Sequence, residues 1–268
     1  MKIGVLGKLS KIGTEETLNE LRRFLELSGH TTVRFLSDNE IDGVDVVIVL
    51  GGDGAILHAA VIAAQKGIKI IGINYGTLGF LTEYEKDERE RVKELLSALE
   101  NGLCRIVKRS ILQVSIGEKT FYALNEVAIQ RDNSLLTALS TQILSTEFST
   151  VEGKELISGD GLLICTPTGS TAYSLSAGGA MLTPEVPVFM MTPICAFSMR
   201  ARPIVFSDEN EFTVTIKKGQ AIVLLDGKVM ALAPKNAQIK IKKAPFTADF
   251  PVKDGSDFFA RVKSKLNG

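Results

Sequence analysis

An apolar run rich in β-branched residues, Val44 to Leu50, ends directly at the tetrapeptide Gly51-Gly52-Asp53-Gly54. The residues that follow, 55–66, have the composition of a helix. A nearly continuous run of this kind is typical of a strand that is buried on both faces, as in a parallel sheet covered by helices. This order of strand, glycine turn and helix therefore indicates an α/β architecture for the first part of the chain.

The same alternation continues on both sides of this segment. Further strands are predicted at residues 3–6, 33–36 and 69–73. A further helix is predicted to begin at Thr14 as its cap and to end at Gly29, and another is predicted over residues 92–102. Gly67 is predicted to end the helix that follows the tetrapeptide. Strands joined by helices predict a parallel sheet with right-handed crossovers.

After about residue 104 the pattern changes to short strands. Apolar and polar residues alternate over 112–116, 212–216 and 239–241, and one strand is predicted to run from Phe121 to Ile129 after a turn at 117–119. The last residues, 256–266, again have helical character. We therefore predict an α/β domain over 1–103 and a β-rich, sandwich-like domain over 104–253, with residues 254–268 returning to the first domain.

The charge balance and the cysteines exclude several classes of protein. The 268 residues carry 31 lysines and arginines against 31 aspartates and glutamates, so no basic field points to nucleic acid or to an anionic membrane. The three cysteines are widely spaced and there are two histidines, which argues against disulfide frameworks and zinc sites. No apolar run approaches the length of a membrane span. We expect a cytoplasmic protein.

The tetrapeptide at residues 51–54 has the features of a phosphate-binding turn. It lies at the carboxyl end of a predicted strand, where open α/β sheets bind ligands. Its glycines allow positive φ angles and close approach of a ligand to the backbone, and the following helix N-terminus favours anions. Asp53 is the reactive side chain there. The alternative is a tight turn in which Asp53 only caps the helix.

A second polar segment has the features of a nucleotide-binding loop. Asp160-Gly161 is followed by small hydroxyl residues and glycines from Thr166 to Gly179, which offer many hydrogen-bond donors after a strand. Within it, Tyr173 is the one aromatic side chain that could contact a flat base. The alternative is a polar loop with Tyr173 in the core.

Taken in order along the chain, these segments resemble the NAD kinase family. Residues 51–54 resemble its GGDG signature, which lipid kinases and phosphofructokinases share in similar form, and residues 169–176 resemble its GSTAYSLS signature. Asn125-Glu126 is similar to its paired Asn-Glu, and residues 74–81 and 225–227 are similar to further segments. The resemblance implies an enzyme that phosphorylates the adenosine 2′-hydroxyl of NAD with ATP, giving NADP.

The resemblance also implies roles for particular residues. Asp53 is the expected general base, and Gly51, Gly52 and Gly54 form the phosphate turn. The residues expected to bind NAD are Asp53, Gly54, His58, Asn125, Glu126, Asp160, Thr171, Ala172, Tyr173, Ser174, Leu175 and Ser176. Ser158 and Lys228 are expected only to line the site. His58 stands where relatives often have a lysine or arginine, and Ala55 where they often have threonine.

The family further implies a divalent cation, with Mg²⁺ expected. Because the sequence offers no acidic cluster for the ion, the phosphates and water would bind it, and no protein metal site is predicted. The chain is expected to form a homodimer or homotetramer. Two alternatives stay open: a lipid kinase of the same superfamily, and a non-catalytic sensor of NAD or NADP.

Overall fold

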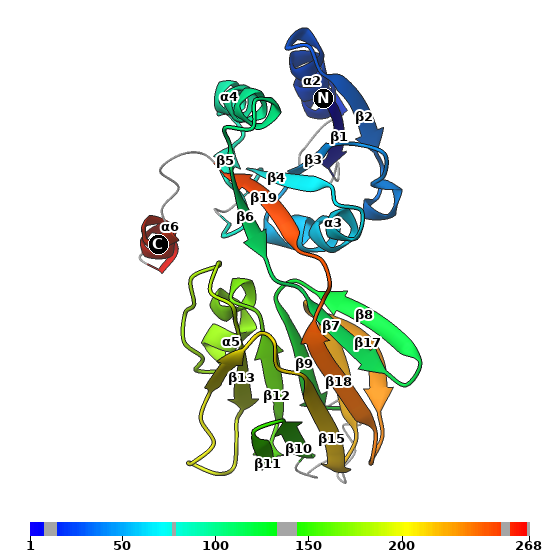
Figure 1. The fold of residues 1–268 in the computed structure, drawn as a ribbon, viewed down its shortest axis with the longest axis vertical. Helices are drawn as coiled ribbons and strands as arrows, with labels where there is room; N and C mark the ends of the chain where they lie inside the picture. Colours follow the sequence, from blue (N-terminus) through cyan, green and yellow to red (C-terminus); the bar gives the residue numbers. More distant parts are fainter. Residues whose placement is uncertain (8–14, 77–78, 133–143, 253–257, 267–268) are drawn as a thin grey trace. The chain divides into compact units, whose positions relative to one another are not determined.

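The computed structural model describes residues 1–7, 15–76, 79–132, 144–252 and 258–266. The chain divides into two compact units, a first domain of residues 1–108 and 246–268 and a second domain of residues 109–245 (Figure 1). None of the helices in the described part of the chain is long and apolar enough to cross a membrane.

A five-stranded parallel sheet forms the centre of the first domain, as the sequence predicts. Its order is β2-β1-β3-β4-β5. The strands are β1 (Lys2–Gly7), β2 (Thr31–Phe35), β3 (Val46–Leu50), β4 (Lys69–Asn74) and β5 (Tyr84–Glu85). The chain moves from β1 to β2 on one side and then to β3 on the other. Ligands of such sheets bind outside the carboxyl ends of the strands at this switch point, and residues 51–54 directly follow β3.

Helices cover both faces of this sheet. The apolar residues of α2 (Glu15–Leu27) and α4 (Arg89–Glu100) share one core with β1, β3 and β4. Helix α3 (Asp53–Gln65) packs against β3 and β4 outside that core, on the opposite face (Figure 1), and a short helix η1 (Asp38–Glu40) contacts it. The expected cap, Thr14, lies outside the described residues.

Two six-stranded antiparallel sheets form the second domain, which confirms the predicted β-rich class. One has the order β11-β10-β15-β18-β7-β8 and the other β14-β13-β12-β9-β16-β17. The strands of the first are β7 (Leu112–Ile116), β8 (Lys119–Ala123), β10 (Leu144–Thr150), β11 (Gly153–Gly159), β15 (Phe212–Lys218) and β18 (Gln238–Lys243). Those of the second are β9 (Glu126–Arg131), β12 (Gly161–Cys165), β13 (Val188–Ile194), β14 (Ile204–Ser207), β16 (Ala221–Leu225) and β17 (Lys228–Ala233).

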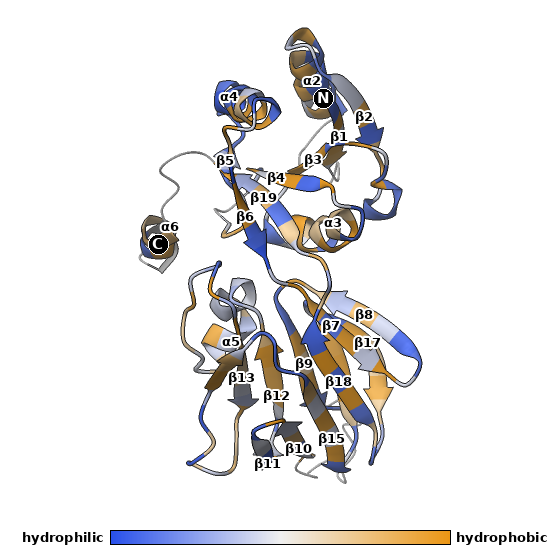
Figure 2. Ribbon diagram, in the orientation of Figure 1, coloured by the Kyte–Doolittle hydropathy of each residue, from blue (hydrophilic) through white to orange (hydrophobic). Residues whose placement is uncertain are grey.

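Side chains from both sheets fill a common core, as in a sandwich. Phe148 and Phe212 of one sheet stack with ring centroids 5.6 Å apart, and Phe189 of the other lies 6.4 Å from Phe212. Strand β18 shows the alternation on which this depends, since Ile239 and Ile241 are buried and alternate with exposed polar residues (Figure 2). Short helices η2 (Thr168–Thr171) and α5 (Tyr173–Ser176) follow β12.

The prediction of one strand from Phe121 to Ile129 is wrong. The chain leaves one sheet at the end of β8 and enters the other at the start of β9, so Leu124 and Asn125 belong to neither. The physical reason is a side chain about a hundred residues further along: Asp226 accepts the backbone N–H groups of both residues. The Asp226 carboxylate thus accepts the two N–H groups that a neighbouring strand would otherwise accept.

The segments that join the two domains also form a small sheet. Strands β6 (Arg105–Arg109) and β19 (Ala248–Val252) pair with each other, and β19 packs on β4 and α3. Because of this packing, the compact units divide at 108/109 and 245/246, whereas the sequence places the boundaries at 103/104 and 253/254. Helix α6 (Phe258–Leu266) lies within the segment expected to be helical.

Candidate active site

The glycine turn after β3 has one glycine that its backbone requires. Gly51 has a φ of +155°, donates its N–H to the Ile73 carbonyl at 3.0 Å, and would place a Cβ 2.9 Å from that of Ala55. Gly52 and Gly54 do not have positive φ, and a Cβ at either would meet no atom within 4 Å. The expectation that all three glycines set the backbone angles is therefore wrong for these two. They leave open space beside the turn.

Asp53 begins helix α3, and its carboxylate binds a neighbouring loop. Its Oδ2 accepts the backbone N–H of Phe80 at 2.8 Å, and its Oδ1 accepts that of Leu81 at 2.9 Å. The same loop is fixed a second time, because the Thr82 hydroxyl accepts the Gly79 N–H at 3.2 Å. Asp53 thus stands at a helix N-terminus, and two backbone amides orient its carboxylate.

The segment at residues 74–81 is built around a buried side chain. Asn74 is 2% exposed and both accepts from and donates to the backbone of Gly76, at 3.1 Å in each direction. It also donates to the Glu85 carboxylate at 3.0 Å. Asn74 therefore shapes the loop that reaches Asp53. Thr77 and Leu78 lie outside the described residues. His58, one turn beyond Gly54 on α3, is half-buried.

In the second domain, Asn125 and Glu126 lie where β8 gives way to β9. Glu126 is only 6% exposed, and its Oε2 atom has no hydrogen-bond partner within the described part of the chain. Burial, and then the neighbouring Asp226, raise the pKa of Glu126 to about 8. A buried carboxyl with an unsatisfied oxygen is costly to a fold unless a ligand supplies the missing partner.

The loop of residues 166–179 has an inner and an outer set of side chains. The inner set is hydrogen-bonded within the protein: Ser170 donates to the Pro167 carbonyl at 2.7 Å, and Ser174 pairs with Thr192 at 2.9 Å. Ser174 is fully buried, so it supports the loop from inside. Thr171, Ala172 and Leu175 are half-buried, and Tyr173 and Ser176 are exposed.

Tyr173 is the aromatic side chain that this loop presents. It is 38% exposed, and its hydroxyl is hydrogen-bonded to Gln130 of β9. Desolvation of its buried part raises the pKa of Tyr173, with Cys195 and Asp160 as smaller causes. Asp160 also forms an ion pair with Arg131, with 3.1 Å between Oδ1 and Nε. These contacts bring Tyr173, Asp160 and β9 to one region of the second domain.

The residues expected only to line the site are less closely involved. Ser158 on β11 pairs with Ser145 at 2.8 Å, and Lys228 is exposed at the start of β17. No group of three histidine, cysteine, aspartate or glutamate residues that could hold a metal ion occurs within the described ranges.

Sequence reasoning missed the role of Asp226. Its carboxylate accepts the N–H groups of Leu124 and Asn125 at 2.8 Å each and that of Glu126 at 3.1 Å. The available signal was Leu225-Asp226-Gly227, but no pattern within one segment reveals a partner so distant in the chain.

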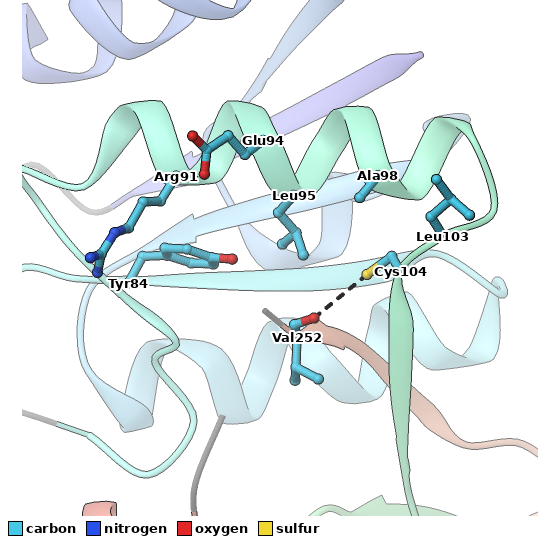
Figure 3. Close-up of a pocket in the computed structure, with 8 residues that line it drawn as sticks. All are labelled: Tyr84, Arg91, Glu94, Leu95, Ala98, Leu103, Cys104 and Val252. Atoms are coloured by element: carbon cyan, nitrogen blue, oxygen red, sulfur yellow. Dashed lines mark hydrogen bonds between the residues drawn. The ribbon is translucent and has the colours of Figure 1, made fainter. Parts of the chain in front are cut away.

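A pocket of about 430 Å³ in the first domain involves none of the site residues predicted from the sequence. It lies beside helix α4, where Tyr84, Leu95 and Val252 face it (Figure 3). Cys104 donates a weak hydrogen bond across it to the Val252 carbonyl, at 3.7 Å.

Two family models match this chain. Residues 3–104 match the ATP-NAD kinase N-terminal domain, and residues 124–251 match the ATP-NAD kinase C-terminal domain. The NAD kinase of Fusobacterium nucleatum is 33% identical over 270 residues, covering 99% of this chain and 97% of the relative. That of Methanothermobacter thermautotrophicus is 37% identical, covering 83% and 76%.

Solved structures share the fold. The NAD kinase from Archaeoglobus fulgidus, in complex with ATP, has a TM-score of 0.81 at 27% identity and covers 98% of this chain and 99% of that one. Yeast NADH kinase, complexed with NADH, has a TM-score of 0.86 at 22% identity and covers 100% of this chain and 87% of that one.

Proposed function

The chain belongs to the NAD kinase family and phosphorylates NAD with ATP, and on that basis we propose that Asp53 is the proton acceptor for the adenosine 2′-hydroxyl. The orientation of its carboxylate by the amides of Phe80 and Leu81 is the observation that carries this proposal. Each oxygen of a carboxylate has about two lone-pair positions, so an oxygen that accepts an amide N–H can also accept a hydroxyl. An ordinary carboxylate suffices as base in phosphoryl transfer.

The first domain also supplies the surroundings of the triphosphate. The turn at residues 51–54 stands at the N-terminus of α3, where the first amides of a helix lack intrahelical partners and favour anions. The open space beside Gly52 and Gly54 supports close approach of phosphate oxygens to the backbone. His58 contributes no fixed positive charge, unlike a lysine or arginine.

The second domain binds the adenosine part of NAD in this proposal. Thr171, Ala172 and Tyr173 contact the base, with Leu175 and Ser176 at the edge of the loop, and Asn125 and Glu126 hold ribose hydroxyls. The unsatisfied Oε2 of Glu126 supports this assignment, because a ribose hydroxyl would provide the donor that the described residues do not. Asp160 lies near enough to Tyr173 for its charge to raise the pKa of the Tyr173 hydroxyl, which supports assigning both residues to the same site.

A divalent cation, Mg²⁺ by its preference for phosphate oxygens, accompanies the triphosphate. In this proposal the ion is held by phosphate oxygens and water. When bound, it offsets charge on the transferring group. The protein's part is to position the two substrates and to accept the proton.

We further propose that the enzyme is a cytoplasmic homodimer or homotetramer. Phe197, Met199 and Val229 of the second domain are 81%, 84% and 60% exposed, which gives apolar surface that an interface between copies would bury. The free thiols of Cys104, Cys165 and Cys195 fit a reducing compartment. Light scattering at micromolar concentration tests the assembly, and a monomeric mass contradicts it.

The acceptor atom is tested with 2′-deoxy-NAD. This analogue keeps the base, the 3′-hydroxyl and the nicotinamide, so it should still bind, but with a lower affinity than NAD because one ribose hydroxyl contact is lost. It should give no phosphorylated product with ATP. A phosphorylated product would show that the acceptor is another hydroxyl, and Asp53 would lose its assigned partner. Turnover of NAD in the same assay, with diacylglycerol as the comparison acceptor, separates this function from that of a lipid kinase or a sensor.

A further inference from the structure

We propose that Asp226 is a positioning residue for the NAD ribose. Its carboxylate holds the corner of residues 124–126 in the backbone geometry that presents Glu126 to the ribose hydroxyls. This inference rests on the proposed ribose contact of Asn125 and Glu126. Asp226 itself is not required to touch NAD, and its effect passes through the backbone of the corner.

The first observation is the convergence of successive amides on one side chain. Asp226 Oδ2 accepts from Leu124 at 2.8 Å, while Oδ1 accepts from Asn125 at 2.8 Å and from Glu126 at 3.1 Å. Successive N–H groups of this kind form a concave anion-binding surface. The corner needs such a partner because the chain crosses there between sheets, and an unpaired N–H inside a protein is costly.

The second observation is that the same corner is fixed through its carbonyl groups. The Asp226 N–H donates to the Glu126 carbonyl at 3.0 Å, so the bond between these two residues is reciprocal. Thr166 donates its hydroxyl to the Leu124 carbonyl at 2.6 Å and its N–H to the Asn125 carbonyl at 2.9 Å. Little freedom remains in the backbone that carries the Glu126 side chain.

The third observation is that the hairpin turn by itself does not require an aspartate. Asp226 and Gly227 have φ angles of +47° and +79° between strands β16 and β17. Glycine or asparagine fits the first position of such a turn as well as aspartate does. The carboxylate is therefore explained by its three amide contacts rather than by the turn.

The fourth observation is that Asp226 lies near Glu126, and Glu126 near Cys165 and Tyr173. Asp226 acts electrostatically on Glu126, and Glu126 in turn acts on Cys165 of β12 and Tyr173 of α5. Asp226 therefore belongs to the same group of side chains as the expected adenosine contacts. A purely structural turn elsewhere in the domain would have no such neighbours.

The test compares two glycine substitutions at turn positions that have a positive φ. Asp226→Gly removes the carboxylate and suits the backbone, and the matched control is Asn236→Gly, at a residue with a φ of +69° in the turn between β17 and β18. Calorimetric titration with NAD and with ATP gives the dissociation constants. We expect Asp226→Gly to weaken NAD binding at least about tenfold, since small misplacements in a site have effects of this order or larger.

Asp226→Asn, which keeps one accepting oxygen, should give an intermediate NAD affinity, while Asn236→Gly should match the wild type and ATP affinity should stay within about twofold in all three. Unchanged NAD affinity in the Asp226 variants, or equal losses for NAD and ATP, would overturn the inference. If Asp226→Gly does not fold, Asp226→Asn carries the test.

Glu126→Ala separates this inference from the proposed function. Loss of NAD affinity in Glu126→Ala together with normal affinity in Asp226→Gly contradicts only the positioning role. Normal NAD affinity in Glu126→Ala contradicts the ribose contact itself, and the positioning role with it.

Discussion

Gly79 and Asp53 meet so closely that position 79 has no room for a side chain. A Cβ built at Gly79 would lie 2.1 Å from Asp53 Oδ1. The glycine thereby lets the loop of residues 79–82 reach the Asp53 carboxylate with its amides. The loop and the first residue of α3 are joined by these hydrogen bonds, so a substitution in either should displace the other.

Gly79→Ala should therefore impair catalysis by displacing the Asp53 carboxylate. We expect turnover to fall on the order of a hundredfold, because a shift of about 1 Å in a catalytic group has effects of this size. The matched control is Gly76→Ala in the same segment, where a Cβ would meet no atom within 4 Å. Steady-state NADP formation by both variants, with melting temperatures to confirm folding, checks this. Wild-type turnover in Gly79→Ala would contradict it.

Glu126 should make the stability of the enzyme depend on pH. Its pKa is raised from 4.5 to about 8 in the folded protein, so the folded state keeps a proton that the unfolded state releases between these values. Stability is then fully present below pH 4.5 and decreases as the pH rises to about 8. The slope from one such group is roughly 1.4 kcal/mol per pH unit.

Glu126→Gln should remove this dependence, because glutamine resembles the protonated acid and does not ionise. Thermal melts without NAD should show the variant close to the wild type near pH 4.5. Above about pH 8 the variant should be more stable than the wild type. A constant difference between the two proteins at every pH would mean that Glu126 does not titrate as its burial implies.

Tyr173→Ala should weaken NAD binding if the ring contacts adenine. Stacking of a base on an aromatic side chain is worth about 1–3 kcal/mol, or roughly a fivefold to 150-fold change in affinity. Tyr173→Phe is the control, because it removes only the hydroxyl that binds Gln130. Calorimetry should then give an affinity for the phenylalanine variant near that of the wild type. Normal binding by Tyr173→Ala would leave the ring without a role in recognition.

The order of helices and strands was accessible from the sequence because its signals are local. Helix α2 buries Leu18, Leu21 and Leu25, and β3 is buried along its entire length, as their spacing predicts. The general place of Asp53 and Tyr173 was also accessible, since each stands at the start of a helix that closely follows a strand.

The contacts that complete each site could not be predicted, because their partners are far apart in the chain. Asp53 binds amides 27 and 28 residues away, and Asp226 binds amides at a separation of 100 to 102 residues. The inner position of Ser174 depends likewise on Thr192. Such pairs follow from how the sheets and loops pack, which periodicity within one segment does not specify.

The proton-acceptor role of Asp53 requires a carefully chosen comparison, because asparagine does not only remove the base. Its amide group would place an N–H donor against one of the two backbone N–H groups that Asp53 accepts, so the loop of residues 79–82 would loosen as well. Thr82→Val loosens that loop by removing the acceptor of the Gly79 N–H and leaves the carboxylate intact. It therefore separates loss of the base from loss of the loop.

The decisive measurement is single-turnover NADP formation at saturating NAD and ATP for wild type, Asp53→Asn and Thr82→Val. General bases contribute about 10²- to 10⁴-fold, so Asp53→Asn should be slower by at least about a hundredfold, while Thr82→Val should stay within roughly tenfold of the wild type. Near-normal turnover in Asp53→Asn, or an equal loss in Thr82→Val, would contradict the assignment of Asp53 as the proton acceptor.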